Sequence, residues 1–298
     1  MLPVLKQRLL IAAALVLGGL IWLLAVHPLS AVGGWSGISL IDPRASIPLA
    51  VVLVLLIGLP AIGLALITAS TGHPISGVFV FAAALSFPAG AGGAIDGLLY
   101  RAQLPQAYLY LALEMLFWAL LLVGFLVLAR QLRGPVRQRF RPLTVKNPQH
   151  EQVQLALPNA AAIIAGIVTA ILAAVLLSFL VQVSDLGQII GGLILAFLLA
   201  SVLTQSLMPQ ANPVLILLSP ALVAIAVYAM TYIRYPTHDA LIGAWHGSQL
   251  IGMAQILPIH YISAGVVGCC LGLGLADYIH RAREQQPQQA ANNDPTAT

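Results

Sequence analysis

The residues best suited to chemistry are ionisable side chains that the apolar blocks of the chain cannot easily place in water. Glu114 lies about seven residues inside the block 107–130, which is about 10 Å below its start at ~1.5 Å per residue. A carboxylate near mid-membrane costs about 2.5–3.5 kcal/mol on insertion scales, so it usually has a partner or a function. Asp96 and Arg101 are the nearest candidate partners. The three residues predict either a salt-bridge network that fixes a hairpin or a carboxylate that handles protons or cations.

Residues that weaken helices gather in two of the apolar blocks, in "LSFPAGAGGAIDG" (85–97) and "LSPAL" (218–222). Proline removes a helix hydrogen bond, and glycine loosens the backbone further. Broken membrane helices are tolerated where the freed backbone groups face protein or a wet cavity, and transporters build binding sites from them. Close packing of small residues is the alternative. The helix-break candidates are Pro88, Gly90, Gly92, Gly93 and Pro220.

A second polar group occurs in the loop 234–257, which is too apolar to extend into water. We predict an interfacial or re-entrant helix that rests against the bundle. On a helix, four polar side chains would share an arc of about 100° and form a stripe that faces an opening in the bundle. The stripe consists of His238, Asp239, His246 and Gln249.

Three kinds of chemistry are open to this stripe. Imidazole and carboxylate groups suit a transition metal, but the chain has no HExxH, His-x-His or CxxC spacing. Ser248 could pair with a histidine as a nucleophile, but no nucleophile motif surrounds it. Hydrogen bonding to headgroups, water or loop backbone is the simplest interpretation.

The rest of the chain gives little support for a metal site or a haem site. His260 and His280 lie at opposite ends of one apolar block, so they cannot form the axial pair of a haem, which needs histidines on two facing helices. Cys269 and Cys270 are adjacent inside that block, which indicates packing rather than a disulfide framework or a zinc site. The sequence therefore predicts no metal site and no cofactor.

The stretch "IGAWHGSQLIG" (242–252) has a weaker copy in "VGGWSGISLI" (32–41). The two share glycines, a tryptophan and aliphatic residues, which suit packing at a membrane surface. The shared pattern therefore predicts a structural role, and any function of the later stretch must rest on the residues that differ, namely His246, Gln249 and Asp239.

Composition identifies the elements that position these residues. The chain of 298 residues is 60% hydrophobic and 7% charged, whereas a soluble domain carries roughly 25% charged residues. Its apolar residues come in blocks that reach the ~20 residues needed to cross a bilayer. We predict an all-α polytopic transmembrane helix bundle of about eight spans, at 8–26, 47–69, 75–99, 107–130, 157–183, 187–208, 213–233 and 258–280.

The lysines and arginines predict the orientation of the bundle, because cytoplasmic loops carry an excess of them. With the N-terminus inside, eight spans return the C-terminus inside. Only Arg44, Arg101 and Arg234 then lie outside. The net charge of +4 is thus concentrated in short loops, which argues against nucleic-acid binding. The cytoplasmic residues are Lys6, Arg8, Arg130, Arg133, Arg137, Arg139, Arg141, Lys146, Arg281 and Arg283.

The domain organisation follows from the same pattern. We predict a single integral membrane domain over 1–281, with a basic cytoplasmic loop at 131–156 and a first helix that is retained rather than cleaved as a signal peptide. The polar segment 282–298 lacks apolar periodicity, which predicts a disordered cytoplasmic tail. "LSFPA" and "LSPAL" would correspond in a four-plus-four duplication, a hypothesis that rests on this short match alone.

Three classes of function fit these observations. The first is a transporter or channel-like protein for a small solute, ion or lipid, supported by the helix-break candidates, Glu114 and the polar stripe. The second is an accessory or structural subunit of a membrane complex, supported by the scarcity of polar residues within the spans. The third is a membrane-embedded enzyme with an outer-face His/Asp site, which we rank last. The expected partners are the lipid bilayer and either a membrane protein or a second copy of the chain, in a bacterial cytoplasmic membrane.

Overall fold

A computed structural model describes residues 2–30, 39–40, 46–91, 105–140 and 159–292. The regular secondary structure of these residues is entirely helical, and eight helices are long and apolar enough to cross a membrane. The predicted polytopic helix bundle is therefore confirmed. Seven spans are α1 (Leu2–Leu23), α3 (Ile47–Thr71), α4 (Pro74–Ala91), α6 (Gln106–Arg139), α7 (Ala160–Leu180), α8 (Leu186–Leu207) and α9 (Val214–Arg234).

The eighth span is irregular at its start. It runs from α11 (Pro258–His260) through a π-helical turn, η4 (Tyr261–Gly265), into α12 (Val266–Asn292). Shorter elements are α2 (Val26–Leu29), α10 (His238–His246) and the 3-10 helix η3 (Gly252–Gln255). Turns of the π type occur frequently at functional sites of helical proteins.

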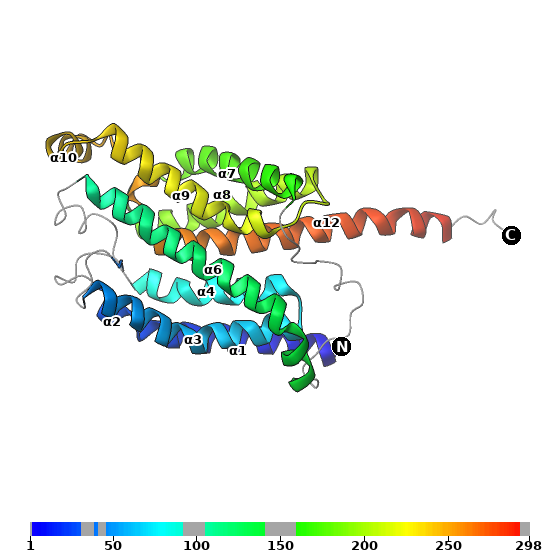
Figure 1. Cartoon of the computed structure of the whole chain (residues 1–298). Helices are drawn as coiled ribbons and strands as arrows, with labels where there is room; N and C mark the ends of the chain where they lie inside the picture. The colour runs from blue at the N-terminus through cyan, green and yellow to red at the C-terminus, as the bar shows by residue number, and fades with distance from the viewer. Residues whose placement is uncertain (1, 31–38, 41–45, 92–104, 141–158, 293–298) are drawn as a thin grey trace.

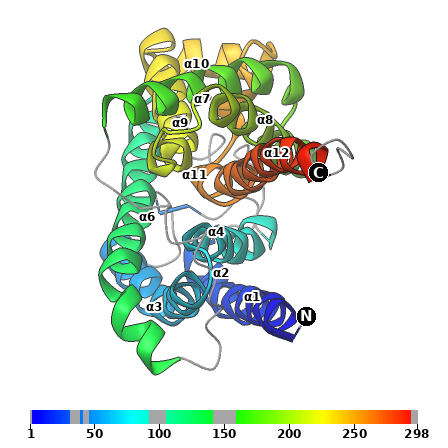
Figure 2. The ribbon, with the colours of Figure 1, turned by 90° about the vertical axis from the view of Figure 1, so that its right-hand side faces the viewer.

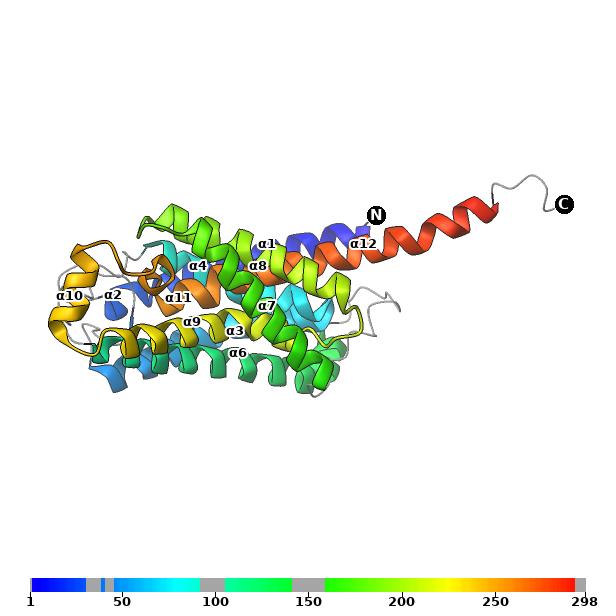
Figure 3. The same cartoon turned by 90° about the horizontal axis from the view of Figure 1, so that it is seen from above.

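The spans lie roughly side by side, and the two ends of the bundle differ (Figure 1). At one end α1 begins and α12 projects beyond the other helices; we call this the terminal end. At the opposite end α10 lies across the bundle (Figure 3); we call this the α10 end. The loop that follows α9 therefore covers the α10 end, as the sequence predicts for 234–257.

The spans form two groups that are visible when the bundle is viewed along its length (Figure 2). The first group comprises α1, α3 and α4, and the second comprises α7, α8, α9 and the α11–α12 span. The helix α6 packs against both α3 and α9, and α4 packs against α11, η4 and α12. The interface between the groups is therefore built mainly by α4, α6 and the start of the last span.

This arrangement agrees in part with a four-plus-four duplication. Within each half, the first span contacts the second and the third, and the second contacts the fourth. The fourth span of each half also packs against the third span of the other half. Two pairs differ. The helix α3 packs against α4 whereas α8 and α9 make no comparable contact, and α9 packs against α12 whereas α4 and α6 make no comparable contact.

Two helices extend beyond their predicted ends at the terminal end. The helix α6 continues through Arg139 into the predicted basic loop 131–156, and α12 continues through Asn292 into the predicted disordered segment 282–298. The prediction of disorder was therefore wrong over residues 282–292. Alanine, arginine, glutamate and glutamine in this segment are good helix formers, and they follow an already formed span. An exposed ion pair between Arg281 and Asp277 joins adjacent turns of the same helix.

The prolines of the third and seventh spans do not interrupt their helices. Pro88 and Pro220 are buried inside α4 and α9, which are continuous over their described lengths. Proline at 220 frees the carbonyl of Ile216, four residues earlier. The hydroxyl of Ser219 donates to this oxygen at 2.7 Å, and the thiol of Cys269 on α12 donates at 3.3 Å. The predicted break at Pro220 was wrong because neighbouring side chains replace the missing backbone donor.

Candidate functional site

Glu114 is the most completely bonded ionisable side chain in the interface between the two helix groups. It lies about two turns into α6 and is 5% exposed. Its Oε2 accepts hydrogen bonds from the Ser39 hydroxyl at 2.5 Å and from the Leu40 backbone N–H at 3.1 Å. Its Oε1 accepts from the Trp118 indole at 3.2 Å. Glu114 therefore fastens the segment that contains Ser39 and Leu40 to α6.

The predicted network of Glu114 with Asp96 and Arg101 stays a prediction, and the described bonding of Glu114 involves other residues. Its partners are three neutral donors, and no described cation lies within ion-pair distance. Asp96, Arg101, Gly92 and Gly93 lie outside the described residues. Three donors satisfy most of the hydrogen-bonding capacity of a carboxylate, so the geometry supports a structural role for this side chain.

A second irregular segment enters the bundle from the same end. Residues 250–257 connect α10 to α11, and most of their side chains are buried. The carbonyls of Met253, Ala254 and Ile256 accept hydrogen bonds from three tyrosine hydroxyls. The donors are Tyr261 at 3.0 Å, Tyr108 at 3.2 Å and Tyr228 at 2.5 Å. These bonds supply partners for backbone groups that are not paired within a regular helix.

Both outer segments are thus anchored on α6, one by Glu114 and the other by Tyr108. Leu40 and Leu250, which align in the two similar stretches of sequence, are both buried. Their burial agrees with packing as the role of this pair. Trp245, from the later stretch, is half-buried, and its counterpart Trp35 lies outside the described residues.

His260 is bonded on one side only. It is the last residue of α11 and is 1% exposed. Its Nε2 lies 3.2 Å from the carbonyl oxygen of Ala89, near the end of α4. Since a carbonyl can only accept, Nε2 carries the proton and donates, which leaves Nδ1 of the neutral ring as an acceptor. No described group lies within hydrogen-bonding distance of Nδ1.

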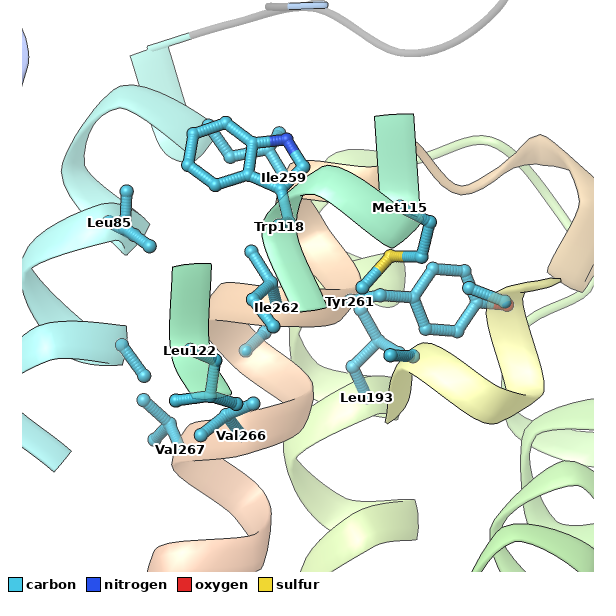
Figure 4. Close-up of a cluster of buried hydrophobic side chains, with 14 of the residues drawn as sticks. Leu85, Met115, Trp118, Leu122, Leu193, Ile259, Tyr261, Ile262, Val266 and Val267 are labelled. Carbon is cyan, nitrogen blue, oxygen red and sulfur yellow. The ribbon is translucent and has the colours of Figure 1, made fainter. Parts of the chain in front are cut away.

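Apolar side chains from both helix groups surround the residues next to His260 in the chain. Figure 4 shows Leu85 of α4, Met115 and Trp118 of α6, and Leu193 of α8 around Ile259 and the π-helical turn. All of these side chains are buried. A buried acceptor with no partner is costly in such a setting, so Nδ1 marks this region as the candidate functional site.

The polar stripe of the outer loop lies elsewhere. His238, Asp239, His246 and Gln249 are all exposed, whereas Leu241 and Ala244 are the buried residues of α10. The prediction that the stripe faces an opening in the bundle stays a prediction. The apolar side of α10 packs inward, so the polar side faces outward. Within the described residues, no three His, Cys, Asp or Glu side chains form a group that could hold a metal.

The sequence singles out Glu114 but does not indicate its described partners Ser39, Leu40 and Trp118, and it gives no role to His260. The only local signal for His260 is a polar residue in the apolar run "LPIHYIS" (257–263), two residues after a proline. The remaining helix-break candidate, Gly90, lies within α4 and is exposed.

No protein-family model, curated protein or solved structure matches the chain.

Proposed function

We propose that this multi-pass membrane protein transports a small solute or ion, and that the solute contacts His260 at the interface between the two helix groups. The observation that carries the proposal is the free Nδ1 of a histidine that is 1% exposed. An ionisable residue within a membrane domain is by default a candidate for a substrate or ion pathway. A ligand that donates a hydrogen bond would satisfy this nitrogen.

The location of His260 supports the same function. Its Nε2 contacts α4, from one helix group, while its backbone starts the last span of the other group. Relative movement of the two groups would therefore change the contact between His260 and Ala89. Many transporters move one bundle against another around a site formed by discontinuous helices. The π-helical turn at Tyr261–Gly265 supplies such a discontinuity.

We also propose an orientation of the protein in the membrane and the membrane in which it lies. The excess of lysine and arginine near the terminal end favours a cytoplasmic position for that end. The α10 end and the buried segment 250–257 would then face the outside of the cell, in a bacterial cytoplasmic membrane. The solute would enter or leave the protein at the α10 end, next to the segment 250–257 that the three tyrosines bind.

A second candidate function is that of an accessory subunit in a membrane complex. The observation in its favour is the dense apolar packing between α4, α6 and the last span (Figure 4), together with the satisfied bonds of Glu114. Such packing is sufficient for an accessory subunit that only supports the other proteins of a complex. This candidate differs from transport in that it gives His260 no ligand.

The full-length protein in proteoliposomes tests the proposal with a panel of labelled amino acids, sugars, nucleosides, organic cations and inorganic ions. We expect saturable, time-dependent uptake of one class of solute. In His260→Ala this uptake should fall at least about tenfold, which corresponds to about 1.4 kcal/mol of lost interaction. Thr169→Val serves as a control, because Thr169 is buried in α7 and bonds only to the Ala165 carbonyl of its own helix.

Two results would contradict the proposal, the first by removing the role of His260 and the second by removing transport itself. The first is uptake in His260→Ala that equals the wild-type rate for every transported solute. The second is the absence of uptake for all solutes together with stoichiometric co-purification of another membrane protein, which would favour the accessory subunit.

A further inference from the structure

Three arginines share one side of α6 close to its end, which lies at the terminal end of the bundle (Figure 1). At 3.6 residues per turn, Arg130, Arg133 and Arg137 fall within an arc of about 60°; we call these three residues the arginine face. Residues three and four positions apart on a helix have Cβ atoms about 5–6 Å apart, so Arg133 lies beside both of the others. Arg139 lies about 180° around the helix from Arg130.

The exposed side chains of α6 place the arginine face at the level of the lipid headgroups. Exposed aliphatic side chains follow one another along the helix from Leu109 to Leu128. This run is about 29 Å long at ~1.5 Å per residue, and the hydrocarbon core of a bilayer is about 30 Å thick. Arg130 and Arg133 lie about 3 Å and about 8 Å further along the helix. They therefore follow the apolar surface where the phosphate groups of one leaflet begin.

The guanidinium groups of this face lack acidic partners within the described residues. No described carboxylate lies within ion-pair distance of Arg130 or Arg133. The one acidic residue of α6 is Glu114, which lies about 24 Å away from Arg130 along the helix. The Nε of Arg133 is shielded from solvent, and no described atom accepts a hydrogen bond from it. These N–H groups can therefore donate to an acceptor supplied from outside the protein.

A phosphate group is the acceptor that suits these donors at this depth. Guanidinium groups bind phosphate oxygens through paired, charge-assisted hydrogen bonds. A zwitterionic lipid brings a cation close to its phosphate, and that cation would face the arginines. An anionic lipid carries the phosphate without it, so the positive face favours a lipid with net negative charge. Lys6 and Arg8, which are exposed at the start of α1, add positive charge at the same end of the bundle.

We propose that the arginine face of α6 binds the headgroup of an anionic phospholipid from the leaflet at the terminal end. The phosphodiester accepts hydrogen bonds from Arg130 and Arg133, and the acyl chains lie along the exposed aliphatic side chains that precede them. This surface is separate from His260, and lipid binding there does not depend on transport.

Native mass spectrometry of the delipidated full-length protein tests this surface, with phosphatidylglycerol and phosphatidylcholine added at equal concentrations. We expect the wild type to bind phosphatidylglycerol about tenfold more tightly than phosphatidylcholine. Each of Arg130→Gln and Arg133→Gln should lower the affinity for phosphatidylglycerol about fivefold, as is typical for one basic residue at an anionic membrane surface. The matched control is Arg139→Gln, which removes the same charge from the opposite side of the same helix and should change the affinity less than about twofold.

The double variant Arg130→Gln/Arg133→Gln should bind the two lipids with nearly equal affinity, and the single variants carry the test if the double variant does not fold. The proposal is overturned if the wild type binds both lipids equally. It is also overturned if Arg139→Gln weakens binding as much as the other two substitutions do, which would indicate an effect of net charge alone. Displacement of phosphatidylglycerol by millimolar inorganic phosphate would equally overturn it, because the arginines would then bind a free anion.

Discussion

Glu114 and His260 are both ionisable, both buried and both located where the two helix groups meet, yet their hydrogen bonding differs. Glu114 accepts three hydrogen bonds, from the first outer loop and from Trp118. His260 makes one contact, to Ala89, and its other ring nitrogen has no described partner. Burial of an ionisable group therefore does not by itself indicate function. A group with all its partners holds the fold together, whereas a group with a free acceptor can bind something else.

The largest expected effect is on the stability of Glu114→Ala. The substitution removes the acceptor that the hydroxyl of Ser39, the N–H of Leu40 and the indole N–H of Trp118 share. We expect a loss in the free energy of unfolding on the order of 3 kcal/mol, since each buried unsatisfied donor costs about 1–3 kcal/mol. Denaturant titration of the reconstituted protein measures this change. A loss below about 0.5 kcal/mol would remove the structural role of Glu114.

A smaller loss is expected for His260→Ala, about 2 kcal/mol, because the Ala89 carbonyl loses its donor and a cavity forms. In His260→Gln the amide group can still donate to Ala89, so about half of this loss should be recovered. The same titration compares the two variants. Equal stability of His260→Ala and the wild type would show that the contact with α4 does not hold the helix groups together.

Ser39→Ala tests whether the first outer loop depends on a single bond to Glu114. The substitution removes one of three donors to the carboxylate, and hydrogen bonds to charged groups contribute about 1.5–3 kcal/mol. We expect a loss of about 1.5 kcal/mol, which should be absent when the substitution is made in the Glu114→Ala background. Additive losses in the double variant would contradict a direct interaction between the two side chains.

The smallest effect is expected for the exposed stripe of α10. Asp239→Asn and His246→Ala should each change the free energy of unfolding by less than about 0.5 kcal/mol, as is usual for exposed positions. Solute uptake should also stay unchanged in both variants. A loss of uptake would return the outer loop to consideration as a binding surface.

The number and approximate position of the spans were predictable because long apolar blocks are a property of the sequence itself. The ends of the spans were less predictable. The helix α6 continues to Arg139 and α12 to Asn292. Most residues in these extensions are good helix formers, and Pro135 and Pro287 within them do not end the helices. Pro220 suggested a helix break that α9 does not have. The sequence does not reveal this, because a replacement donor for the Ile216 carbonyl comes from Cys269, 53 residues away in the chain.

The candidate site was predictable only where a residue is unusual for its position. Glu114 is a lone carboxylate in an apolar block, so its importance can be inferred from the sequence. Its partner Ser39 is 75 residues away, and no local pattern links the two. His260 lies near the end of a span, where histidine is unremarkable. Its significance follows from tertiary contacts that bury one nitrogen without a partner.

The most direct test of the account is the rate of solute uptake per folded molecule in His260→Ala and Glu114→Gln, measured side by side in proteoliposomes. Glu114→Gln keeps a side chain of the same shape with one acceptor oxygen, so its folded fraction should transport at close to the wild-type rate. His260→Ala should fold but lose at least about tenfold in rate. The opposite result, normal uptake in His260→Ala and lost uptake in folded Glu114→Gln, would contradict the assignment of function to His260.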